Sequence, residues 1–354
     1  MGPVWSPARG PALPITSTEA EMEILLSHGG GGKRTRELIE KVFLKYFENE
    51  KLSELGDSAL FDATVGQYAF TTDSYVVSPL FFPGGDIGKL AVSGTINDLS
   101  ASGAEPLYLS AAFIIEEGFV LEDLEKIVSS MSKTASEVGI PVITGDTKVV
   151  ERGKADGLFI NTSGIGRLYR TPPPSPERIE PGDVLLVNGT IGDHGITVMA
   201  LREKILEDPG DLRSDCAPLW DLVKSVLDAV DVKFMRDPTR GGLAAVANEI
   251  VRGKSFGLNL YEEKVPVREA VRGLSEILGI DPLLAANEGK MVFVVGREEA
   301  QRALDTMRSH PLGKESSIIG EFTDEAPGKV ILVTAYGTRR ILEMPQGEQL
   351  PRIC

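Results

Sequence analysis

The spacing of apolar residues divides the chain into alternating helices and strands. From position 33 to 47 they recur at helical spacing, which predicts an amphipathic helix directly after the glycine run at 29–32. Runs rich in β-branched and aromatic residues predict strands at 68–77, 107–115, 141–144 and 158–168. Helices are expected between them at 87–102 and 121–138. The first half is therefore expected to be one α/β unit.

A proline-rich stretch at 171–176 interrupts this pattern, and a Pro-Gly-Asp turn at 181–183 closes it. Proline fits neither a helix interior nor a central strand, so the domain boundary is expected there. Helices then follow at 194–206, 218–230, 241–252, 265–278 and 298–310, with strands at 184–187, 290–295, 318–322 and 330–335. The expected organisation is a disordered arm or extension at 1–21, a first domain at 22–170, a linker at 171–182, a second α+β domain at 183–344 and a flexible tail at 345–354.

Composition and charge narrow the class of protein. With 354 residues and 42% apolar content, the chain can bury a large core. It has 37 Lys and Arg against 52 Asp and Glu, and the formal charge of -15 repels nucleic acid and anionic membranes. No apolar run is long enough to span a membrane, and the first residues lack a signal-peptide core. A cytoplasmic protein is expected, with no nucleic-acid or membrane partner.

The chain ends in a cysteine, Cys354, and its only other cysteine is Cys216. Two cysteines make no disulfide framework, and a reducing compartment suits a terminal thiol that stays free. Pro351 cannot continue a helix, which predicts an extended end able to enter an active site or reach another subunit. A frayed terminus is the competing interpretation. Cys216 is expected to be a buried small hydrophobe.

Acidic residues of the first half recur at the ends of apolar runs and in loops. Carboxylates in such places are natural magnesium ligands, because magnesium takes oxygen donors and bridges phosphates. Turn and capping roles explain each residue alone, but four such settings together favour a magnesium and nucleotide site. The candidates are Asp57, Asp73, Asp98 and Asp146.

A glycine loop at 28–33 runs into the first predicted helix. Bare backbone amides at a helix N-terminus suit a phosphate, although four glycines are equally typical of a hinge. The loop is not a Walker motif, which would need glycine at 27 and serine or threonine at 34, where this chain has Ser27 and Arg34.

Two loops of the second half leave similar alternatives open. Asp193 and His194 open one predicted helix and Arg240 precedes another, so either helix start could hold an anionic group. Capping and helix packing explain them equally well, and a lone histidine is more often a structural residue. Glu288 supplies a further carboxylate in a loop before a strand.

Eight motifs in order, from about residue 22 to the end, give the chain a specific resemblance. Together they resemble the HypE family of hydrogenase maturation factors, within the PurM-like superfamily of aminoimidazole ribonucleotide synthetase. The motifs are His28-Gly-Gly-Gly-Gly32, Thr72-Asp73-Ser74, Phe82-Pro83-Gly84-Gly85, Gly94-Thr95-Ile96-Asn97-Asp98, Gly145-Asp146-Thr147-Lys148-Val149, Gly192-Asp193-His194-Gly195, Asp237-Pro-Thr-Arg-Gly-Gly-Leu243 and Pro351-Arg352-Ile353-Cys354.

The resemblance implies two PurM-like α+β domains and a homodimer whose N-terminal strands form a β-barrel across the subunit interface, where ATP binds. It implies that Cys354 receives a carbamoyl group from the carbamoyltransferase HypF. ATP and Mg²⁺ then serve to dehydrate the thiocarboxamide to a thiocyanate. Its cyanide passes to iron held by HypC and HypD and becomes a ligand of the [NiFe]-hydrogenase active site.

Motif matches also imply roles for single residues. Lys148 and Glu288 are the candidate bases for the two protons that leave the amide nitrogen. His194 and Arg240 are assigned to phosphate or tail contact, and Arg352 to offsetting the terminal carboxylate. The other expected nucleotide and metal residues are Gly29, Gly30, Gly31, Gly32, Lys33, Asp57, Asp73, Asn97, Asp98, Asp146 and Thr147.

Two other functions remain open from the sequence. A PurM-like enzyme acting on a small-molecule amide or a selenium donor would give Cys354 no role. An adaptor whose tail is only a docked peptide would bind nucleotide without turnover.

Overall fold

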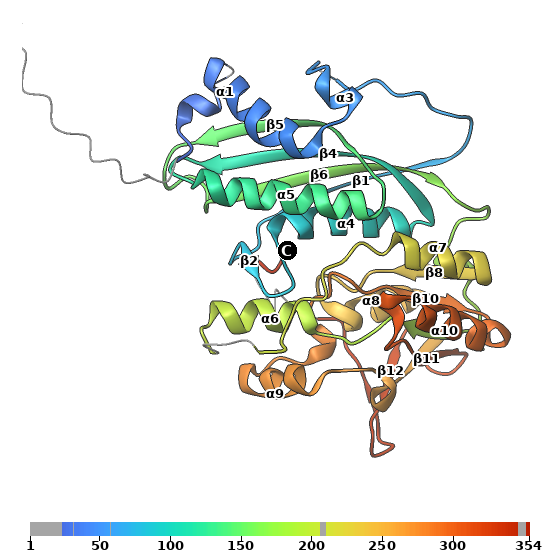
Figure 1. The fold of residues 1–354 in the computed structure, drawn as a ribbon. Helices are drawn as coiled ribbons and strands as arrows, with labels where there is room; N and C mark the ends of the chain where they lie inside the picture. Colours follow the sequence, from blue (N-terminus) through green and yellow to red (C-terminus); the bar gives the residue numbers. More distant parts are fainter. Residues whose placement is uncertain (1–22, 31, 57, 206–209, 346–351) are drawn as a thin grey trace, which may run out of the picture.

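The computed structural model describes residues 23–30, 32–56, 58–205, 210–345 and 352–354. They form two α+β units, one above the other in Figure 1, with the C-terminus lying between them. The expected arm at 1–21, Gly31, Asp57 and positions 346–351 of the tail fall outside the described residues.

The first unit is built on a four-stranded sheet in the order β1-β6-β4-β5. Strands β4 and β5 are parallel, and the other pairs are antiparallel. Helix α4 packs against β1, β6 and β4, and α5 packs against α4. The elements are β1 (Tyr68–Tyr75), β2 (Phe81–Phe82), β3 (Gly85–Asp86), α4 (Ile87–Ala101), β4 (Ala104–Glu116), α5 (Leu121–Glu137), β5 (Val142–Val150) and β6 (Leu158–Leu168).

Helix α4 is buried on almost every side because it lies between the sheet and the second unit. Glycine permits this close approach, since a Cβ atom at Gly94 would overlap the hydroxyl group of Tyr75 on β1. Asp86 caps the helix through the backbone amides of Gly88 and Lys89, at 2.7 and 3.0 Å. The helix is thus capped at its N-terminus and packs closely on the sheet at its middle.

The predicted N-terminal helix forms at 33–47 in three successive segments. These are α1 (Lys33–Leu38), a π-helical turn (Ile39–Phe43) and α2 (Leu44–Phe47), followed by α3 (Glu50–Ser53). The ring of Phe43 lies 4.7 Å from that of Phe113 on β4, so the buried face of this helix joins the core of the first unit.

The second unit contains a seven-stranded sheet in the order β13-β12-β9-β11-β7-β10-β8. Alternate residues of β10 enter two cores: Val292 and Val294 pack with α8, and Phe293 and Val295 with α7 and α10. The elements are β7 (Val184–Val187), α6 (Asp193–Arg202), α7 (Trp220–Ala229), β8 (Val232–Arg236), α8 (Gly242–Val251), β9 (Gly257–Tyr261), α9 (Glu269–Leu278), β10 (Val292–Val295), α10 (Ala300–Ser309), β11 (Ser317–Thr323), β12 (Val330–Val333) and β13 (Arg339–Ile341).

Several predicted elements differ from the structure. The strand expected at 141–144 continues to Val150, because the polar residues after Thr144 stay in register with β4. The helix expected at 265–278 begins only at Glu269, since the carbonyl group of Pro266 accepts the Ile191 amide instead. Strands β8 and β9 were not predicted, although both pair within the sheet.

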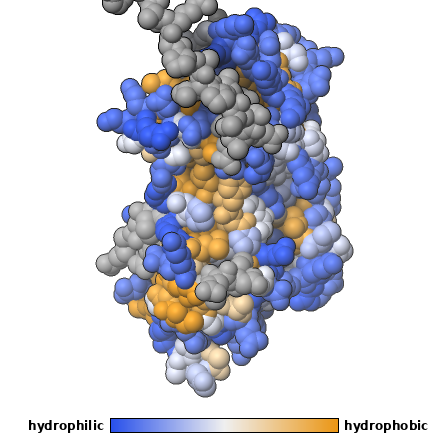
Figure 2. Space-filling view, turned by 60° about the vertical axis from the view of Figure 1, so that its left-hand side comes forward, coloured by the Kyte–Doolittle hydropathy of each residue, from blue (hydrophilic) through white to orange (hydrophobic). Residues whose placement is uncertain are grey.

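The two units share one apolar core. Residues of α4, α5, α7 and α10 belong to a single cluster, and Ile353 of the tail is buried in it. In Figure 2 an apolar patch occupies the middle of the molecule and continues down onto its lower part. The end of the chain is therefore part of the contact between the units.

Candidate functional site

The thiol of Cys354 lies in a small chamber between the two units. This interdomain chamber has a volume of about 50 Å³ and is lined by Asp73, Asp98, Asp237, Arg240, Glu288 and Cys354, among others. A larger groove of about 720 Å³, which we call the tail groove, is lined by Cys354, Arg240 and residues of the tail and α8. The chain end thus brings a nucleophilic atom beside four carboxyl groups and one guanidinium group.

Carboxyl groups dominate the electrostatics of the chamber. Burial and the charge of Asp98 raise the pKa of Asp73 to about 7, although Arg240 opposes the shift. Burial and the charges of Asp98 and Asp73 likewise raise the pKa of Asp237 to about 7. Burial and these neighbours hold the pKa of Glu288 well above its ordinary value. Such crowding of carboxylates favours cation binding or shared protons.

The thiol itself is held in its protonated form. Burial and the charge of Glu288 raise the pKa of Cys354 to about 12, although a hydrogen bond from Arg240 opposes the shift. A thiol with this pKa is a weak nucleophile at neutral pH, because the thiolate is the reactive species.

Main-chain contacts seat the tail. The Nε2 atom of His194 lies 2.9 Å from the carbonyl oxygen of Ile353, and its Nδ1 atom lies 2.8 Å from the hydroxyl oxygen of Ser214. The carbonyl oxygen of Arg352 accepts hydrogen bonds from Arg202, at 2.6 Å, and from the Ser78 amide, at 3.3 Å. His194 is fully buried, so the structure places it under the tail.

The side chain of Arg352 contacts the first unit. Its Nε atom donates to the carbonyl oxygen of Val76, at 3.1 Å, and its guanidinium group pairs with Asp156. The expectation that this side chain offsets the terminal carboxylate does not match these contacts. The arginine next to Cys354 that affects the thiol is Arg240.

Asn97 links the two units. Its side-chain nitrogen donates to the carbonyl groups of Ala217 and Glu288, at 3.1 and 3.2 Å, and its oxygen accepts the Leu219 amide at 2.8 Å. Of these partners, Glu288 lies on the loop before β10, whereas Ala217 and Leu219 directly precede α7. These bonds hold the second unit against α4, and the expected contact of Asn97 with nucleotide stays a prediction.

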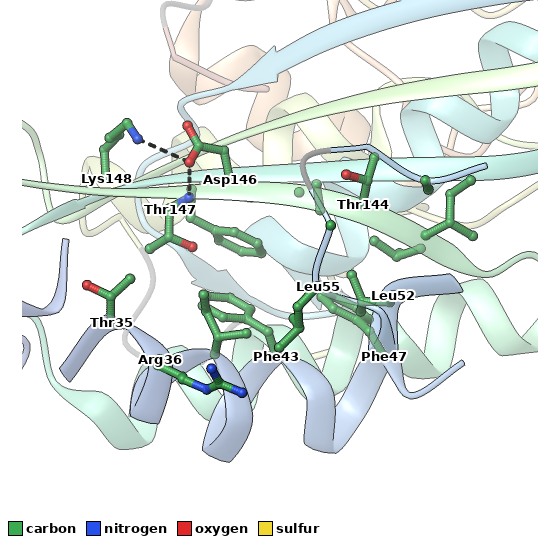
Figure 3. A pocket seen from close by; sticks show the side chains of 18 of the residues that line it. Thr35, Arg36, Phe43, Phe47, Leu52, Leu55, Thr144, Asp146, Thr147 and Lys148 are labelled. Carbon is green, nitrogen blue, oxygen red and sulfur yellow. Dashed lines mark hydrogen bonds and ion pairs between the residues drawn. The ribbon is translucent and has the colours of Figure 1, made fainter. Parts of the chain in front are cut away.

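A second cavity lies at the β5 edge of the first unit. This edge pocket has a volume of about 610 Å³ and is lined by Gly29, Gly30, Gly32, Thr35 and Arg36, by β5 from Val142 to Lys148, and by an apolar floor. Figure 3 shows Thr147 pointing toward Thr35 and Arg36, with Asp146 and Lys148 on the other side of the strand. The apolar floor includes Ile39, Phe43, Phe47, Leu52 and Leu55.

The glycine loop lies directly on β5. A Cβ atom at Gly29 would lie 2.5 Å from the backbone nitrogen of Val149, whereas one at Gly30 would meet nothing closer than 3.9 Å. Lys33 extends into solvent and pairs with Glu37 at 3.7 Å. The pocket thus has bare amides at one end and apolar rings at the other, as a nucleotide requires.

The expected site residues therefore fall into two groups within one chain. Asp73 pairs across the sheet with Thr162, Thr162 with Ala111, and Ala111 with Gly145. Asp146 is consequently three strand spacings from Asp73, or about 14 Å. Lys148, whose Nζ atom pairs with Asp146 at 3.1 Å, lies on the same far edge. One chain does not bring Lys148 to Glu288, or Asp146 to the other aspartates.

The chamber carboxylates fit Mg²⁺. Asp73, Asp98 and Asp237 line the chamber and would supply oxygen ligands, and no donor among the described residues reaches the buried Oε1 atom of Glu288. No group of three or more His, Cys, Asp or Glu side chains is arranged as a complete metal site in the described part of the chain. This is compatible with magnesium, which binds one or two carboxylates together with substrate phosphates.

Two residues of the site were not predicted from the sequence. Asp237 lies three positions before Arg240 in the same motif, and its carboxyl group lines the chamber. Asp215 carried no motif signal, yet it bonds the loop of Glu288. The expectation for Cys216 is confirmed, because it is a buried free cysteine.

Comparison with known proteins defines the class first. Residues 56–168 match the N-terminal domain of AIR synthase related proteins, and residues 180–333 match their C-terminal domain. This confirms the predicted PurM-like fold. No helix in the described residues is long and apolar enough to cross a membrane.

The particular family follows from full-length relatives. The chain is 50% identical over 337 residues to carbamoyl dehydratase HypE of Rhizobium leguminosarum, covering 95% of this chain and 96% of that one. It is 48% identical over 336 residues to carbamoyl dehydratase HypE of Escherichia coli, covering 94% and 99%. The chain belongs to the HypE family of carbamoyl dehydratases.

Solved structures agree. A HypE in complex with ATP has a TM-score of 0.89 and 46% identity, covering 93% of this chain and 99% of that one. A HypE–HypF complex has a TM-score of 0.75 and 51% identity, covering 87% and 99%. Thiamine monophosphate kinase of Aquifex aeolicus has a TM-score of 0.59 and 19% identity over 78% of this chain and 91% of that one, and shows only the shared fold.

Proposed function

We propose that this chain dehydrates an S-carbamoyl group on its own Cys354 to a thiocyanate, using ATP, during maturation of [NiFe]-hydrogenase. The observation that carries the proposal is the position of Cys354, seated between the two units against Glu288 and Arg240. Full-length relatives named carbamoyl dehydratase support it. A small-molecule amide is a weaker candidate substrate, because the chain end lines the chamber and leaves a volume of only about 50 Å³ there.

The chemistry balances in two stages. The carbamoyl oxygen is a poor leaving group, so it first takes a phosphoryl group from ATP, and the carbon–oxygen bond then breaks to release phosphate. The amide nitrogen loses two protons as the carbon–nitrogen triple bond forms. Arg240 is placed to offset negative charge that develops beside the sulfur.

Glu288 is the base that the chamber supplies. It is fully buried, and burial together with Asp237 and Asp215 raises its pKa well above the ordinary value. Positive charge held by Asp73, Asp98 and Asp237 lowers this pKa toward neutrality, where a carboxylate accepts protons efficiently. Mg²⁺ held by these three residues would supply that charge and shield the transferred phosphate.

The space and the electrostatics of the chamber favour carbamoylation of the tail outside its seat. Burial raises the pKa of Cys354 to about 12 in the magnesium-free chain, and the chamber beside the thiol has a volume of only about 50 Å³, so the seated thiol is a poor acceptor. The tail therefore leaves its seat to be carbamoylated and returns as a neutral adduct, which suits a crowded acidic site. The carbamoyltransferase HypF is the proposed donor, in line with the solved HypE–HypF complex. HypC and HypD are the proposed acceptors of the cyanide.

A homodimer would bring together the expected nucleotide residues that lie at the two ends of the sheet in one chain. The sheet face opposite α4 leaves Phe70 69% exposed and Ile114 44% exposed, which favours its burial against a second copy as an intersubunit barrel. In that assembly the edge pocket of one chain adjoins the chamber of the other. Lys148, Asp146, Thr147 and the glycine loop at 29–33 then act on nucleotide phosphates, together with Asp73 and Asp98 across the interface.

Mapping the modified cysteine tests the proposal. The chain is incubated with a HypF carbamoyltransferase, carbamoyl phosphate and ATP, and its peptides are analysed by mass spectrometry. The proposal expects the adduct on the C-terminal peptide and none on Cys354→Ala. An adduct on Cys216, or turnover of a free amide by Cys354→Ala, would contradict it.

A further inference from the structure

Glu288 sits on a loop that one buried aspartate holds. The Oδ1 atom of Asp215 accepts the Glu288 amide at 3.2 Å, and its Oδ2 atom accepts the Gly289 amide at 3.1 Å. The ammonium group of Lys290 lies 3.1 Å from the same Oδ2 atom. Three consecutive residues therefore direct their donors at one carboxylate.

The loop cannot shift easily. A Cβ atom at Gly289 would overlap the carbonyl oxygen of Asp215, so the two backbones are in contact. On the other side, the carbonyl oxygen of Glu288 accepts from Asn97, at 3.2 Å, and from the Ala217 amide, at 3.4 Å. The segment at 215–217 thus hydrogen-bonds both the amide and the carbonyl group of Glu288.

The same segment also touches the seat of the tail. Ser214 contacts His194, which bonds the carbonyl oxygen of Ile353, and the Ser214 amide donates to Pro83 of the first unit at 2.8 Å. Asp215 is charged, because Lys290, His194 and the Glu288 amide outweigh burial and lower its pKa. The ionised Asp215 thus lies between Ser214, which contacts the histidine under the tail, and Glu288, whose carboxyl group faces the thiol.

We infer that Asp215 is the positioning residue for Glu288, fixing the loop so that the Glu288 carboxyl group faces the group carried by Cys354. The inference rests on the proposed function and deepens it. Misplacing a reacting group by about 1 Å costs on the order of a hundredfold in rate. Asparagine has the shape of aspartate, but its amide group would face a backbone N–H and could accept from only one of the two.

The test measures conversion of carbamoylated chain to thiocyanate in a single turnover, across a range of ATP concentrations. Asp215→Asn is expected to lower the first-order rate constant at saturating ATP by roughly ten- to a hundredfold while leaving half-saturation by ATP unchanged. A rate within twofold of wild type would overturn the inference, and so would a changed half-saturation with an unchanged rate constant. If the wild-type chain itself gives no thiocyanate, the proposed function fails instead.

Asp183→Asn is the matched control. Asp183 is also buried, pairs with Lys233 at 2.8 Å and accepts the Glu180 amide at 2.7 Å, in the same unit but outside the chamber lining. It should lose stability without losing rate. The double variant Asp215→Asn/Lys290→Gln restores charge balance if the single variant folds poorly. A folded double variant with a lowered rate constant supports the positioning role of Asp215. A wild-type rate constant would mean that Asp215 serves only as a counter-ion of Lys290.

Discussion

The Nε2 atom of His194 lies 2.9 Å from the carbonyl oxygen of Ile353, although 159 positions separate the two residues. Because His194 contacts a main-chain carbonyl group, the contact does not depend on the group that the sulfur carries. Arg202 binds the preceding carbonyl group, that of Arg352, so the end of the chain is held in the way that an enzyme holds a peptide substrate.

Loss of this contact should loosen the tail. His194→Ala removes a hydrogen bond worth about 1 kcal/mol, so Cys354 should be alkylated roughly fivefold faster in the absence of partners. Peptide mapping after timed alkylation measures the rate. Cys216 is the internal control, since it is buried and should remain unmodified in both proteins. Equal alkylation rates at Cys354 would mean that His194 does not seat the tail.

Local sequence patterns predicted the helices and strands that carry the site, but they did not predict which of these elements contact each other. Helical spacing predicted the segment at 33–47, and Phe43 of that helix does pack on the sheet. Nothing local relates His194 to Ile353, or Asp215 to Glu288, because those contacts depend on how the two units close on each other. Asp146 and Asp73 looked like one ligand set in sequence, yet the strand order sets them at opposite edges of one sheet.

The carboxyl cluster should destabilise the empty protein as pH rises. The folded pKa of Asp237 is about 7, above its ordinary value of 3.8, so the folded chain binds this proton more tightly than the unfolded chain. Its contribution to stability is complete below about pH 4 and is lost as pH rises through 7. Asp237→Asn should therefore stabilise the nucleotide-free and magnesium-free chain by on the order of 4 kcal/mol at pH 8, and by little at pH 4.

Thermal unfolding at the two pH values measures this difference. Asp231→Asn is the control, because Asp231 is an exposed partner of Arg178 at 2.8 Å. The same Asp237→Asn protein should lose the stabilisation that Mg-ATP gives to wild type. A pH-independent effect would show that the carboxyl group is not strained by its neighbours.

The glycine loop offers a matched pair of substitutions. Gly29→Ala forces a Cβ atom to 2.5 Å from the Val149 backbone, so the loop must move off β5. Gly30→Ala has room, with nothing closer than 3.9 Å. If the loop closes over phosphates, calorimetry should show ATP affinity lowered about tenfold, or ~1.4 kcal/mol, by Gly29→Ala and little changed by Gly30→Ala. Equal affinities would remove the edge pocket from the nucleotide site.

The two candidate bases should fail in different ways. Glu288→Gln keeps the volume of the chamber but removes the proton acceptor, so it should still bind ATP and accumulate thiocarboxamide on Cys354. Lys148 lies on an exposed strand edge, 64% exposed, where its point charge suits phosphate. Lys148→Ala should therefore weaken ATP binding first. If Lys148→Ala kept wild-type ATP affinity but did not dehydrate the adduct, Lys148 would instead be assigned as a catalytic base.

The central claim is that the seated tail is dehydrated in place, and the intact mass of the chain tests it most directly. Carbamoylated wild-type chain is mixed with excess Mg-ATP, free of every partner, and its mass is followed in time. We expect the adduct on Cys354 to lose the mass of one water as ADP and phosphate form in equal amounts, and Glu288→Gln to keep the full adduct. Hydrolysis of ATP with an unchanged adduct mass in wild type would contradict the account.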